Sequence, residues 1–293
     1  MLRCRYLQEW NLGKRDKKGM TLMDINDIVH YPHDEMTTFM LPITLGCAYN
    51  KCAFCSMYKD IQYRRVPISE IEPQLMNGYL YTEKVFLTGA DPLTIGFDEM
   101  VQILRLIKKY LPYCARVACY ASIRIVLKYS EEQLSILHNE GLRLLYIGFE
   151  TGSDDVLELM NKPHKVVDAI TAAKKLNRAQ LMFNTIIMYG IAGKGEAVSN
   201  AIATSKMINQ FHTNSIITMN LTIFEGTTLN DMVKNGEFII PDRNERLLEI
   251  KSLLENLEPI KPTIFDTTHP TNIIKIKGTL PQEKEKLIKA INI

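Results

Sequence analysis

Three cysteines fall within nine residues of this chain, at Cys47, Cys52 and Cys55. Cysteine thiolates are the usual ligands of iron–sulfur clusters and of structural zinc. A structural zinc site normally takes four ligands at paired spacings, but here the next cysteine, Cys114, lies 59 residues beyond Cys55. We therefore interpret the three cysteines as ligands of an iron–sulfur cluster that leaves one iron open to a small molecule.

Other uses of the cysteines stay open. A zinc site could be completed by a distant histidine (His30, His33 or His164), and a disulfide with one free thiol is a further alternative. The amino-terminal sequence MLRCRYLQEW has no apolar segment typical of a signal peptide. We thus expect a reducing cytoplasm, where metal binding is favoured over disulfides.

The remaining cysteines need no metal. Cys4 has no cysteine near it in the sequence and is expected to be a free thiol. Cys114 and Cys119 flank and occupy a predicted strand, where cysteine behaves as a small buried apolar residue. A second cluster is therefore not expected.

The elements that would position the cysteines alternate regularly along the chain. Apolar, β-branched runs predict strands at 39–45, 84–89, 115–121, 143–149, 182–189 and 215–222. Segments with helical periodicity lie between and after them, at 68–80, 98–110, 130–140, 153–177, 196–210 and 241–256. Strands alternating with helices indicate a parallel sheet with right-handed crossovers.

The expected fold is therefore α/β, a partial TIM-type (β/α)6 barrel. We assign 1–38 to an N-terminal extension lying across the barrel, 39–225 to the barrel core and 226–293 to a C-terminal cap. Short extended pieces (273–276) and a final helix from about 281 are expected in the cap. Ligand sites of such folds lie at the carboxyl ends of the strands, and the cysteines follow the first strand directly.

Composition excludes several classes of protein. Apolar residues make up 46% and charged residues 23% of the chain, as in ordinary globular proteins. The net charge of +2 gives no broad electrostatic surface for nucleic acid, so nucleic acid is not an expected partner. No apolar run approaches the roughly 18 residues that suggest a membrane span. The basic run at 14–18 is interpreted as a solvated face.

The stretch 44–55, Thr-Leu-Gly-Cys-Ala-Tyr-Asn-Lys-Cys-Ala-Phe-Cys, resembles the cluster loop of the radical S-adenosylmethionine (SAM) superfamily. The aromatic Phe54 before the third cysteine is part of that pattern. The family usually has three residues between its first two cysteines, and this chain has four. That departure marks a subfamily and leaves the substrate class open.

Later strand ends carry weaker resemblances to the same superfamily. The segment 87–92 resembles its Gly-Gly-Glu segment, with Ala90 and Asp91 in place of Gly and Glu, and 148–153 resembles a segment of coproporphyrinogen-oxidase-like members. The segment 188–193 resembles the stretch beside adenine. The cofactor-binding residues that the resemblance implies are Phe54, Gly89, Ala90, Asp91, Ser122, Glu150, Ser153, Met188 and Tyr189.

The resemblance implies a [4Fe–4S] cluster held by the three cysteines and SAM bound to its open iron. In such enzymes the reduced cluster cleaves SAM to methionine and a 5′-deoxyadenosyl radical, which removes hydrogen from a small-molecule substrate. An electron donor such as flavodoxin or ferredoxin is an implied partner. The protein's own task is to bind, orient and exclude water.

The substrate is the least determined part. The short architecture resembles the queuine lyase group, which implies cleavage of queuosine, a modified nucleoside, to release queuine during salvage. Glu225 could accept two hydrogen bonds from a guanine-like edge. Other polar residues expected near the substrate are Asn220, Asp266 and His269.

Two alternatives remain. The first is a coproporphyrinogen-oxidase-like or methylating radical SAM enzyme acting on a tetrapyrrole or another nucleoside. The second is a metal-binding module without enzymatic activity that recognises RNA through the basic N-terminus. Iron, sulfide and zinc analysis separates the enzyme from the module.

Overall fold

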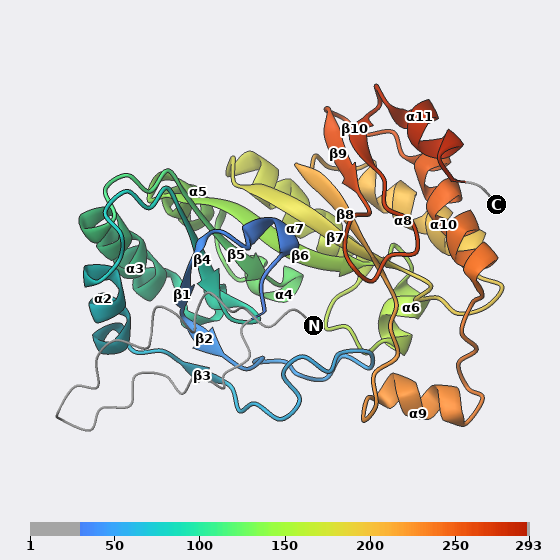
Figure 1. Cartoon of the computed structure of the whole chain (residues 1–293), viewed down its shortest axis with the longest axis horizontal. Helices are drawn as coiled ribbons and strands as arrows, with labels where there is room; N and C mark the ends of the chain where they lie inside the picture. The colour runs from blue at the N-terminus through green and yellow to red at the C-terminus, as the bar shows by residue number, and fades with distance from the viewer. Residues whose placement is uncertain (1–29, 292–293) are drawn as a thin grey trace.

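The computed structural model of the chain describes residues 30–291, and a single eight-stranded sheet forms its centre (Figure 1). Neighbouring strands are parallel throughout, except that the last is antiparallel to the one before it. In spatial order the strands are β1 (Phe39–Pro42), β4 (Lys84–Thr88), β5 (Arg116–Ala121), β6 (Leu142–Glu150), β7 (Met182–Tyr189), β8 (Ser215–Asn220), β9 (Thr263–Asp266) and β10 (Lys277–Leu280). The six predicted strands are all present, and the open α/β part-barrel is confirmed.

Helices connect the parallel strands, as right-handed crossovers require. They are α2 (Ile68–Met76), α3 (Phe97–Tyr110), α4 (Ile123–Val126), α5 (Glu131–Asn139), α6 (Asp154–Leu159), α7 (Val166–Arg178), α8 (Ala197–Ile208), α9 (Thr228–Lys234), α10 (Arg243–Asn256) and α11 (Lys284–Lys289), with the 3-10 turns η1 (His33–Glu35) and η2 (Pro92–Ile95). A separate two-stranded ribbon pairs β2 (Thr44–Leu45) with β3 (Arg64–Arg65). Among the described residues, none of the helices has the length and apolarity needed to cross a membrane.

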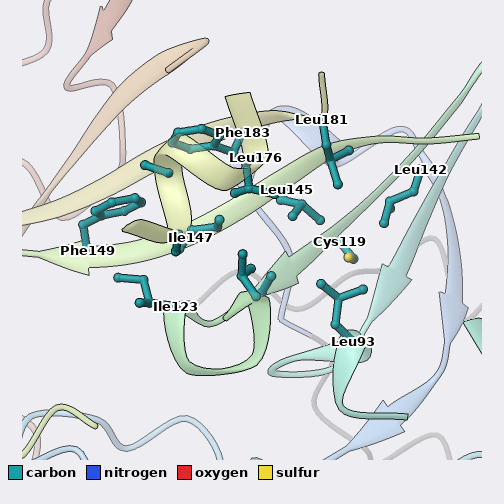
Figure 2. Packing of buried hydrophobic residues seen from close by; sticks show 14 of the residues in the cluster. Leu93, Cys119, Ile123, Leu142, Leu145, Ile147, Phe149, Leu176, Leu181 and Phe183 are labelled. Atoms are coloured by element: carbon teal, nitrogen blue, oxygen red, sulfur yellow. The ribbon is translucent and has the colours of Figure 1, made fainter. Parts of the chain in front are cut away.

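The main core lies between the sheet and its helices. Figure 2 shows Cys119 of β5 packed among leucine, isoleucine and phenylalanine side chains, and it is fully buried. This position confirms its interpretation as a small apolar residue. The neighbouring Tyr120 points to the other face, where it packs with Phe86 and Tyr146 in a smaller cluster. Alternate residues of one strand thus serve two faces of the sheet.

The described end of the N-terminal extension packs against this second face. Figure 1 shows η1 in front of β5 and β6. Glu35 is fully buried and lies 2.7 Å from the Arg116 guanidinium. The Tyr146 hydroxyl donates hydrogen bonds to Asp34 at 2.7 Å and to Glu35 at 2.9 Å. Cys4 and the basic run at 14–18 lie outside the described residues.

Two local predictions are wrong. The helix expected over 153–177 is two helices, α6 and α7, separated at 160–165. Asn161 adopts a left-handed φ of 51° there, and Pro163 follows, so the chain turns out of the helix. Residues 273–276 form no strand, because β10 begins at Lys277.

The C-terminal part continues the central sheet. β9 pairs in parallel with β8 through Ile216 and Phe265, and β10 closes that edge. Helix α10 packs beside α8 (Figure 1). The division into extension, barrel core and cap stays a prediction, since the sheet itself runs on past residue 225.

Candidate active site

The three cysteines lie on the loop that follows β2, and all three are free and half-buried. Gly46 begins the loop with φ of 68°, and a Cβ there would lie 2.8 Å from the carbonyl oxygen of Ile61. Only glycine therefore allows the returning segment to pack against the start of the loop. Asn50 shapes the loop from inside: its backbone N–H donates to Cys47 Sγ at 3.3 Å, and its side chain donates to the Tyr58 carbonyl at 2.8 Å.

The rest of the fold holds the loop at both sides. The Ala53 N–H donates to the Met160 carbonyl at 2.9 Å, and the Ala53 carbonyl accepts from Leu229 N–H at 2.9 Å. Asn161 donates to the Lys51 carbonyl at 2.8 Å. These hydrogen bonds, two between backbone groups and one from the Asn161 side chain, place the cysteines between the end of α6 and the start of α9.

The thiols lie close enough to influence one another. Burial raises the pKa of Cys52 to about 11, the Lys162 ammonium opposes this, and the other two cysteines add to the rise. Burial also raises the pKa of Cys55, with a further contribution from Cys47. Burial thus favours the neutral thiol form of Cys52 and Cys55, so metal binding at these two residues would release protons.

The donor set suits an iron–sulfur group. Three cysteines lie on one loop, and cysteine thiolates are the usual ligands of such clusters.

A buried ion pair lies next to the cysteine loop. The Lys162 ammonium is 2.9 Å from the Glu150 carboxylate, and their side chains are 12% and 9% exposed. Lys162 also lies 5.9 Å from the centre of the Phe54 ring, beside the third cysteine. Burial opposes the charge of Lys162, but the Glu150 carboxylate outweighs it and raises the pKa of Lys162, so the lysine keeps its charge at neutral pH. This cation is the functional feature that the sequence analysis missed.

Local backbone geometry builds this pair. Glu150 has a left-handed φ of 64°, and the β6–β7 register is irregular between Gly148 and Glu150. This conformation is unusual for a residue other than glycine and is the kind of strain found at functional sites. A Cβ at Gly148 would lie 2.4 Å from the Glu150 carboxylate and 3.7 Å from the Lys162 nitrogen, so glycine makes room for the pair.

Two buried polar atoms near the ends of β2 and β4 have no hydrogen-bond partner among the described residues: Thr44 Oγ1 and Asp91 Oδ1. The other Asp91 oxygen accepts from the Ser122 N–H at 3.1 Å. Burial raises the pKa of Asp91 to about 7, although the bonds from Ser122 oppose the shift. A Cβ at Gly89 would lie 2.0 Å from Thr44 Oγ1, so the two segments approach through glycine. Unpartnered buried groups indicate a place where a ligand could complete the hydrogen bonds.

The other predicted cofactor residues are distributed around this region. Ala90 is half-buried between Gly89 and Asp91. Ser153 caps α6 by accepting from Val156 N–H at 3.4 Å. Met188 packs in one apolar cluster with Ala53, against which Phe54 also lies.

The side chains of Met188 and Tyr189, adjacent residues of β7, belong to two different apolar clusters. Met188 belongs to the cluster that includes the cysteine loop. The Tyr189 side chain instead belongs to the main core, and its hydroxyl accepts from the Ile273 N–H at 3.0 Å. Only the backbone of Tyr189 is thus free to line the predicted cofactor site.

The predicted substrate residues are not one constellation. Asn220 donates to the Thr271 carbonyl at 3.3 Å and accepts a hydrogen bond from Arg246. Asp266 pairs with Lys277 at 2.7 Å, and His269 lies 2.7 Å from the Thr271 hydroxyl. Asn220 thus joins the end of β8 to the segment after β9, whereas Asp266 pairs with β10 and His269 contacts its own segment.

Glu225 differs from them. It is exposed in the turn between β8 and α9, and it makes no hydrogen bond or ion pair with the described part of the chain. Gly226, the next residue, accepts a hydrogen bond from Lys59 of the cysteine loop through its carbonyl. The free carboxylate is therefore attached to a turn that contacts the loop.

The fold and the site together define an α/β part-barrel with a three-cysteine cluster loop at the carboxyl ends of its strands. The sequence profile of the Radical SAM superfamily matches residues 41–204, and the chain belongs to this superfamily. The prediction of a [4Fe–4S] cluster and SAM is confirmed at the level of the family.

Curated relatives are distant. The chain is 20% identical over 219 residues to "Heme chaperone HemW" of Bacillus subtilis, covering 71% of this chain and 56% of HemW. It is 24% identical over 236 residues to an uncharacterized protein of Methanocaldococcus jannaschii, covering 75% and 72%. The match thus spans little more than half of HemW.

Solved structures support the fold. Methylornithine synthase (PylB) matches with a TM-score of 0.56 at 16% identity, covering 77% of this chain and 63% of PylB. Coproporphyrinogen III oxidase (HemN) from Escherichia coli, a radical SAM enzyme, matches with a TM-score of 0.54 at 12% identity, covering 74% and 50%. At such identity, the likeness concerns the fold alone.

Proposed function

We propose that Cys47, Cys52 and Cys55 hold a [4Fe–4S] cluster, and that SAM binds beside it to start a radical reaction on a small molecule. The observation that carries this proposal is the set of three free, half-buried thiols on one anchored loop. When bound, these groups supply an electron and a 5′-deoxyadenosyl radical that removes hydrogen from the substrate.

The chain's own residues position the reactants. The buried Lys162 offers a cation, and Glu150 holds that cation at the loop. Asp91 presents a carboxylate oxygen with no partner in the described chain, suited to a ligand N–H or O–H. Met188 and Phe54 give the apolar wall that excludes water from a radical.

The proposed substrate is queuosine, whose cleavage would release queuine and make the enzyme a lyase. Glu225 supports this choice, since it is the predicted substrate residue whose carboxylate is not engaged by the described residues. A carboxylate can accept two parallel hydrogen bonds from the amino–imino edge of a deazaguanine. Such nucleoside salvage belongs in the cytoplasm, with flavodoxin or ferredoxin as the electron donor.

Anaerobic reconstitution tests the proposal in two stages. The first stage measures iron, sulfide and SAM-dependent 5′-deoxyadenosine with dithionite as reductant; absence of that product rejects the radical SAM activity. The second stage adds queuosine and measures queuine. Queuine formation at the level of a no-enzyme control would reject this substrate while leaving the first stage intact.

The second stage also needs a matched variant and a rival substrate. Glu225→Gln keeps the size of the side chain and removes its charge, so we expect queuine release to fall at least tenfold, since a hydrogen bond to a charged group contributes about 1.5–3 kcal/mol. Coproporphyrinogen III is the rival substrate, because the fold is similar to that of HemN. Its conversion in place of queuosine would assign the chain to the tetrapyrrole alternative.

A further inference from the structure

Helix α10 carries a buried carboxylate that contacts a strand end at the predicted cofactor site. Glu249 is 4% exposed. One of its oxygens accepts a hydrogen bond from the Gly190 N–H at 2.7 Å, and Gly190 belongs to the segment 188–193 that resembles the stretch beside adenine. The other oxygen accepts from the Asn200 side chain of α8, also at 2.7 Å. Both oxygens of the carboxylate therefore bind donors, and these donors come from two different segments.

Asn200 extends this contact to the end of β6. Its amide oxygen accepts a hydrogen bond from the Thr151 hydroxyl, and Thr151 Oγ1 accepts from the Ser153 N–H at 3.1 Å. Thr151 is fully buried, and Asn200 is 4% exposed. We call Glu249, Asn200 and Thr151 the Glu249 network. In a buried network of this kind each hydrogen bond is strengthened by the low polarity of its surroundings.

Close packing fixes the same strand end against α8. The Gly152 N–H donates to the Thr204 hydroxyl oxygen at 3.0 Å. A Cβ at Gly152 would lie 2.3 Å from the Ala203 carbonyl oxygen, so glycine is needed for this approach. Glu150, with its left-handed φ of 64°, comes just before these two anchored residues. Such a backbone conformation persists only where the surroundings hold it.

The Glu249 network lies next to the predicted cofactor residues. One small cavity is lined, among others, by Glu150, Met188, Tyr189, Asn200 and Glu249. The first three are predicted to bind the cofactor, and the last two belong to the network. A change at Glu249 would therefore reach the cofactor site through its neighbours.

From these contacts we propose that Glu249 is a positioning residue for SAM. It holds the backbone of Gly190 and, through Asn200 and Thr151, the end of β6 in the conformation that binds the cofactor. The inference rests on the proposed function, since it assumes that SAM lies at these strand ends. The matching superfamily profile ends at residue 204, so Glu249 comes from the part of the chain beyond it. A site held by such supporting residues binds its ligand without having to rearrange.

A purely structural role would be served better by an uncharged side chain. Burial raises the pKa of Glu249 to about 7, although its hydrogen bonds and Arg246 oppose the rise, and Glu245 adds to it. Tyr189 of β7 is a further titratable group that interacts with this carboxylate. The ionised form of Glu249 therefore lowers the stability of the folded chain above pH 7. An amide of the same size would avoid this loss, but it could not accept from both donors.

The test compares three variants with the reconstituted wild type. Glu249→Gln keeps the size of the side chain and replaces one accepting oxygen by an NH2 group, which cannot accept from Asn200. Glu249→Gln/Asn200→Asp keeps the net charge and restores the network, because the new carboxylate can accept from both the amide and the Thr151 hydroxyl. Leu254→Val is the control, since it removes one methylene group at a fully buried position of α10 and leaves the polar groups of the network unchanged.

SAM binding and 5′-deoxyadenosine formation with dithionite give the first measurement. We expect Glu249→Gln to raise the Kd and KM for SAM about tenfold, the order of effect of losing one hydrogen bond to a charged group. The kcat should change less than about threefold, because the network does not touch the reacting atoms. The double variant should recover most of the affinity, and Leu254→Val should keep the KM of the wild type.

Urea unfolding separates this effect from a loss of stability. At pH 8 Glu249→Gln should unfold at a urea concentration no lower than that of the wild type, because it carries no buried charge. Leu254→Val should unfold at a lower urea concentration. Weaker SAM binding in the more stable of these two variants would not follow from a structural role alone.

Amide hydrogen exchange tests the network in the protein without SAM. Peptides that cover 149–154 and 186–191 should exchange faster in Glu249→Gln than in the wild type, since the variant loses a hydrogen bond that joins these segments. The double variant and Leu254→Val should exchange in these peptides as the wild type does. Unchanged exchange in Glu249→Gln would overturn the proposal.

The kinetic results can also overturn it. The proposal is wrong if the KM of Glu249→Gln for SAM lies within about twofold of the wild type, or if the double variant binds SAM no better than the single one. If the wild type itself forms no 5′-deoxyadenosine, the proposed function fails and the positioning role fails with it. If the wild type forms that product and Glu249→Gln binds SAM equally well, the positioning role alone is rejected.

Discussion

The two ends of the described chain treat their buried polar groups differently. Around the cysteine loop, three thiols are free, and both Thr44 Oγ1 and one Asp91 oxygen have no partner within residues 30–291. Near α10, the carboxylate of Glu249 accepts from Gly190 N–H and from Asn200, each at 2.7 Å. The guanidinium of Arg246 donates to the carbonyls of Pro241 and Leu221 at 3.0 Å.

This difference in hydrogen bonding of buried polar groups indicates which region is suited to binding a ligand. Buried polar groups are normally hydrogen-bonded, because leaving one without a partner costs about 1–3 kcal/mol. The first region keeps such groups uncompensated, which suits a site completed by cofactors. In the second region the carboxylate of Glu249 and the guanidinium of Arg246 are both hydrogen-bonded within the protein, which suits a structural support for the ends of β7 and β8.

The largest expected effect concerns the thiols. We expect Cys47→Ala to abolish cluster assembly and to lower 5′-deoxyadenosine formation at least about 100-fold, since the loop offers no replacement ligand. Iron and sulfide analysis after reconstitution checks this. The matched control is Cys114→Ala, which removes a half-buried thiol that donates to the Arg116 carbonyl at 3.6 Å and packs against the main core; this variant should retain the cluster. Equal iron content in both variants would contradict the claim that the loop thiols, and not Cys114, bind the cluster.

The buried ion pair gives the next effect. Lys162→Met leaves the Glu150 carboxylate buried without its partner, and we expect the free energy of unfolding to fall by about 3 kcal/mol. The double variant Lys162→Met/Glu150→Gln should recover part of that loss, because no unpaired charge remains. Anaerobic urea unfolding followed by circular dichroism measures all three proteins. A single variant as stable as the wild type would show that solvent already reaches the pair.

The pH dependence of stability tests the second region. Burial raises the pKa of Glu249 from 4.5 to about 7 despite its hydrogen bonds. The folded protein therefore binds this proton more tightly than the unfolded chain does. The resulting stabilisation is fully present below pH 4.5 and is lost as the pH rises through 7.

Glu249→Gln should remove this decrease in the free energy of unfolding. The decrease amounts to roughly 3 kcal/mol, at about 1.4 kcal/mol per pKa unit. Asp91 has a pKa raised to about 7 as well, so Asp91→Asn is the matched variant for the first region. Urea unfolding from pH 4 to pH 8 gives the curves. If the free energy of unfolding of Glu249→Gln depends on pH as that of the wild type does, Glu249 is not the buried acid that titrates in the region near α10.

The smallest effect is expected at the edge of the sheet. Asp266 pairs with Lys277, whose side chain is 54% exposed, and such pairs contribute about 0–1 kcal/mol. Asp266→Asn should therefore change the free energy of unfolding by less than about 1 kcal/mol and leave the KM for substrate within twofold. A large rise in KM would instead show that Asp266 belongs to the substrate site and not to the structural support.

The sequence predicted the strands and the cysteine loop well, because both depend on local patterns. Continuous β-branched runs predicted β4 through β8 to within about two residues at each end. The Ser-x-x-Gln pattern that begins at Ser130 also forms a capping box, with the two bonds to Gln133 at 2.9 and 3.0 Å. Such features are determined by neighbouring residues alone.

Long-range contacts could not be predicted in this way. The Glu150–Lys162 pair depends on a left-handed strand end and on a helix break, and helical periodicity over 153–177 concealed that break. Pro163 was the available signal. The engagement of Asn220 by Arg246 joins residues 26 positions apart, and no local pattern indicates it.

The central claim is that the three thiols of the loop hold a cluster that activates SAM. Its most direct test is anaerobic reconstitution of the wild-type chain with iron and sulfide, followed by SAM and dithionite. We predict about four irons and four sulfides per chain, as a [4Fe–4S] cluster requires, together with 5′-deoxyadenosine. One bound zinc, little iron and no 5′-deoxyadenosine would contradict the account.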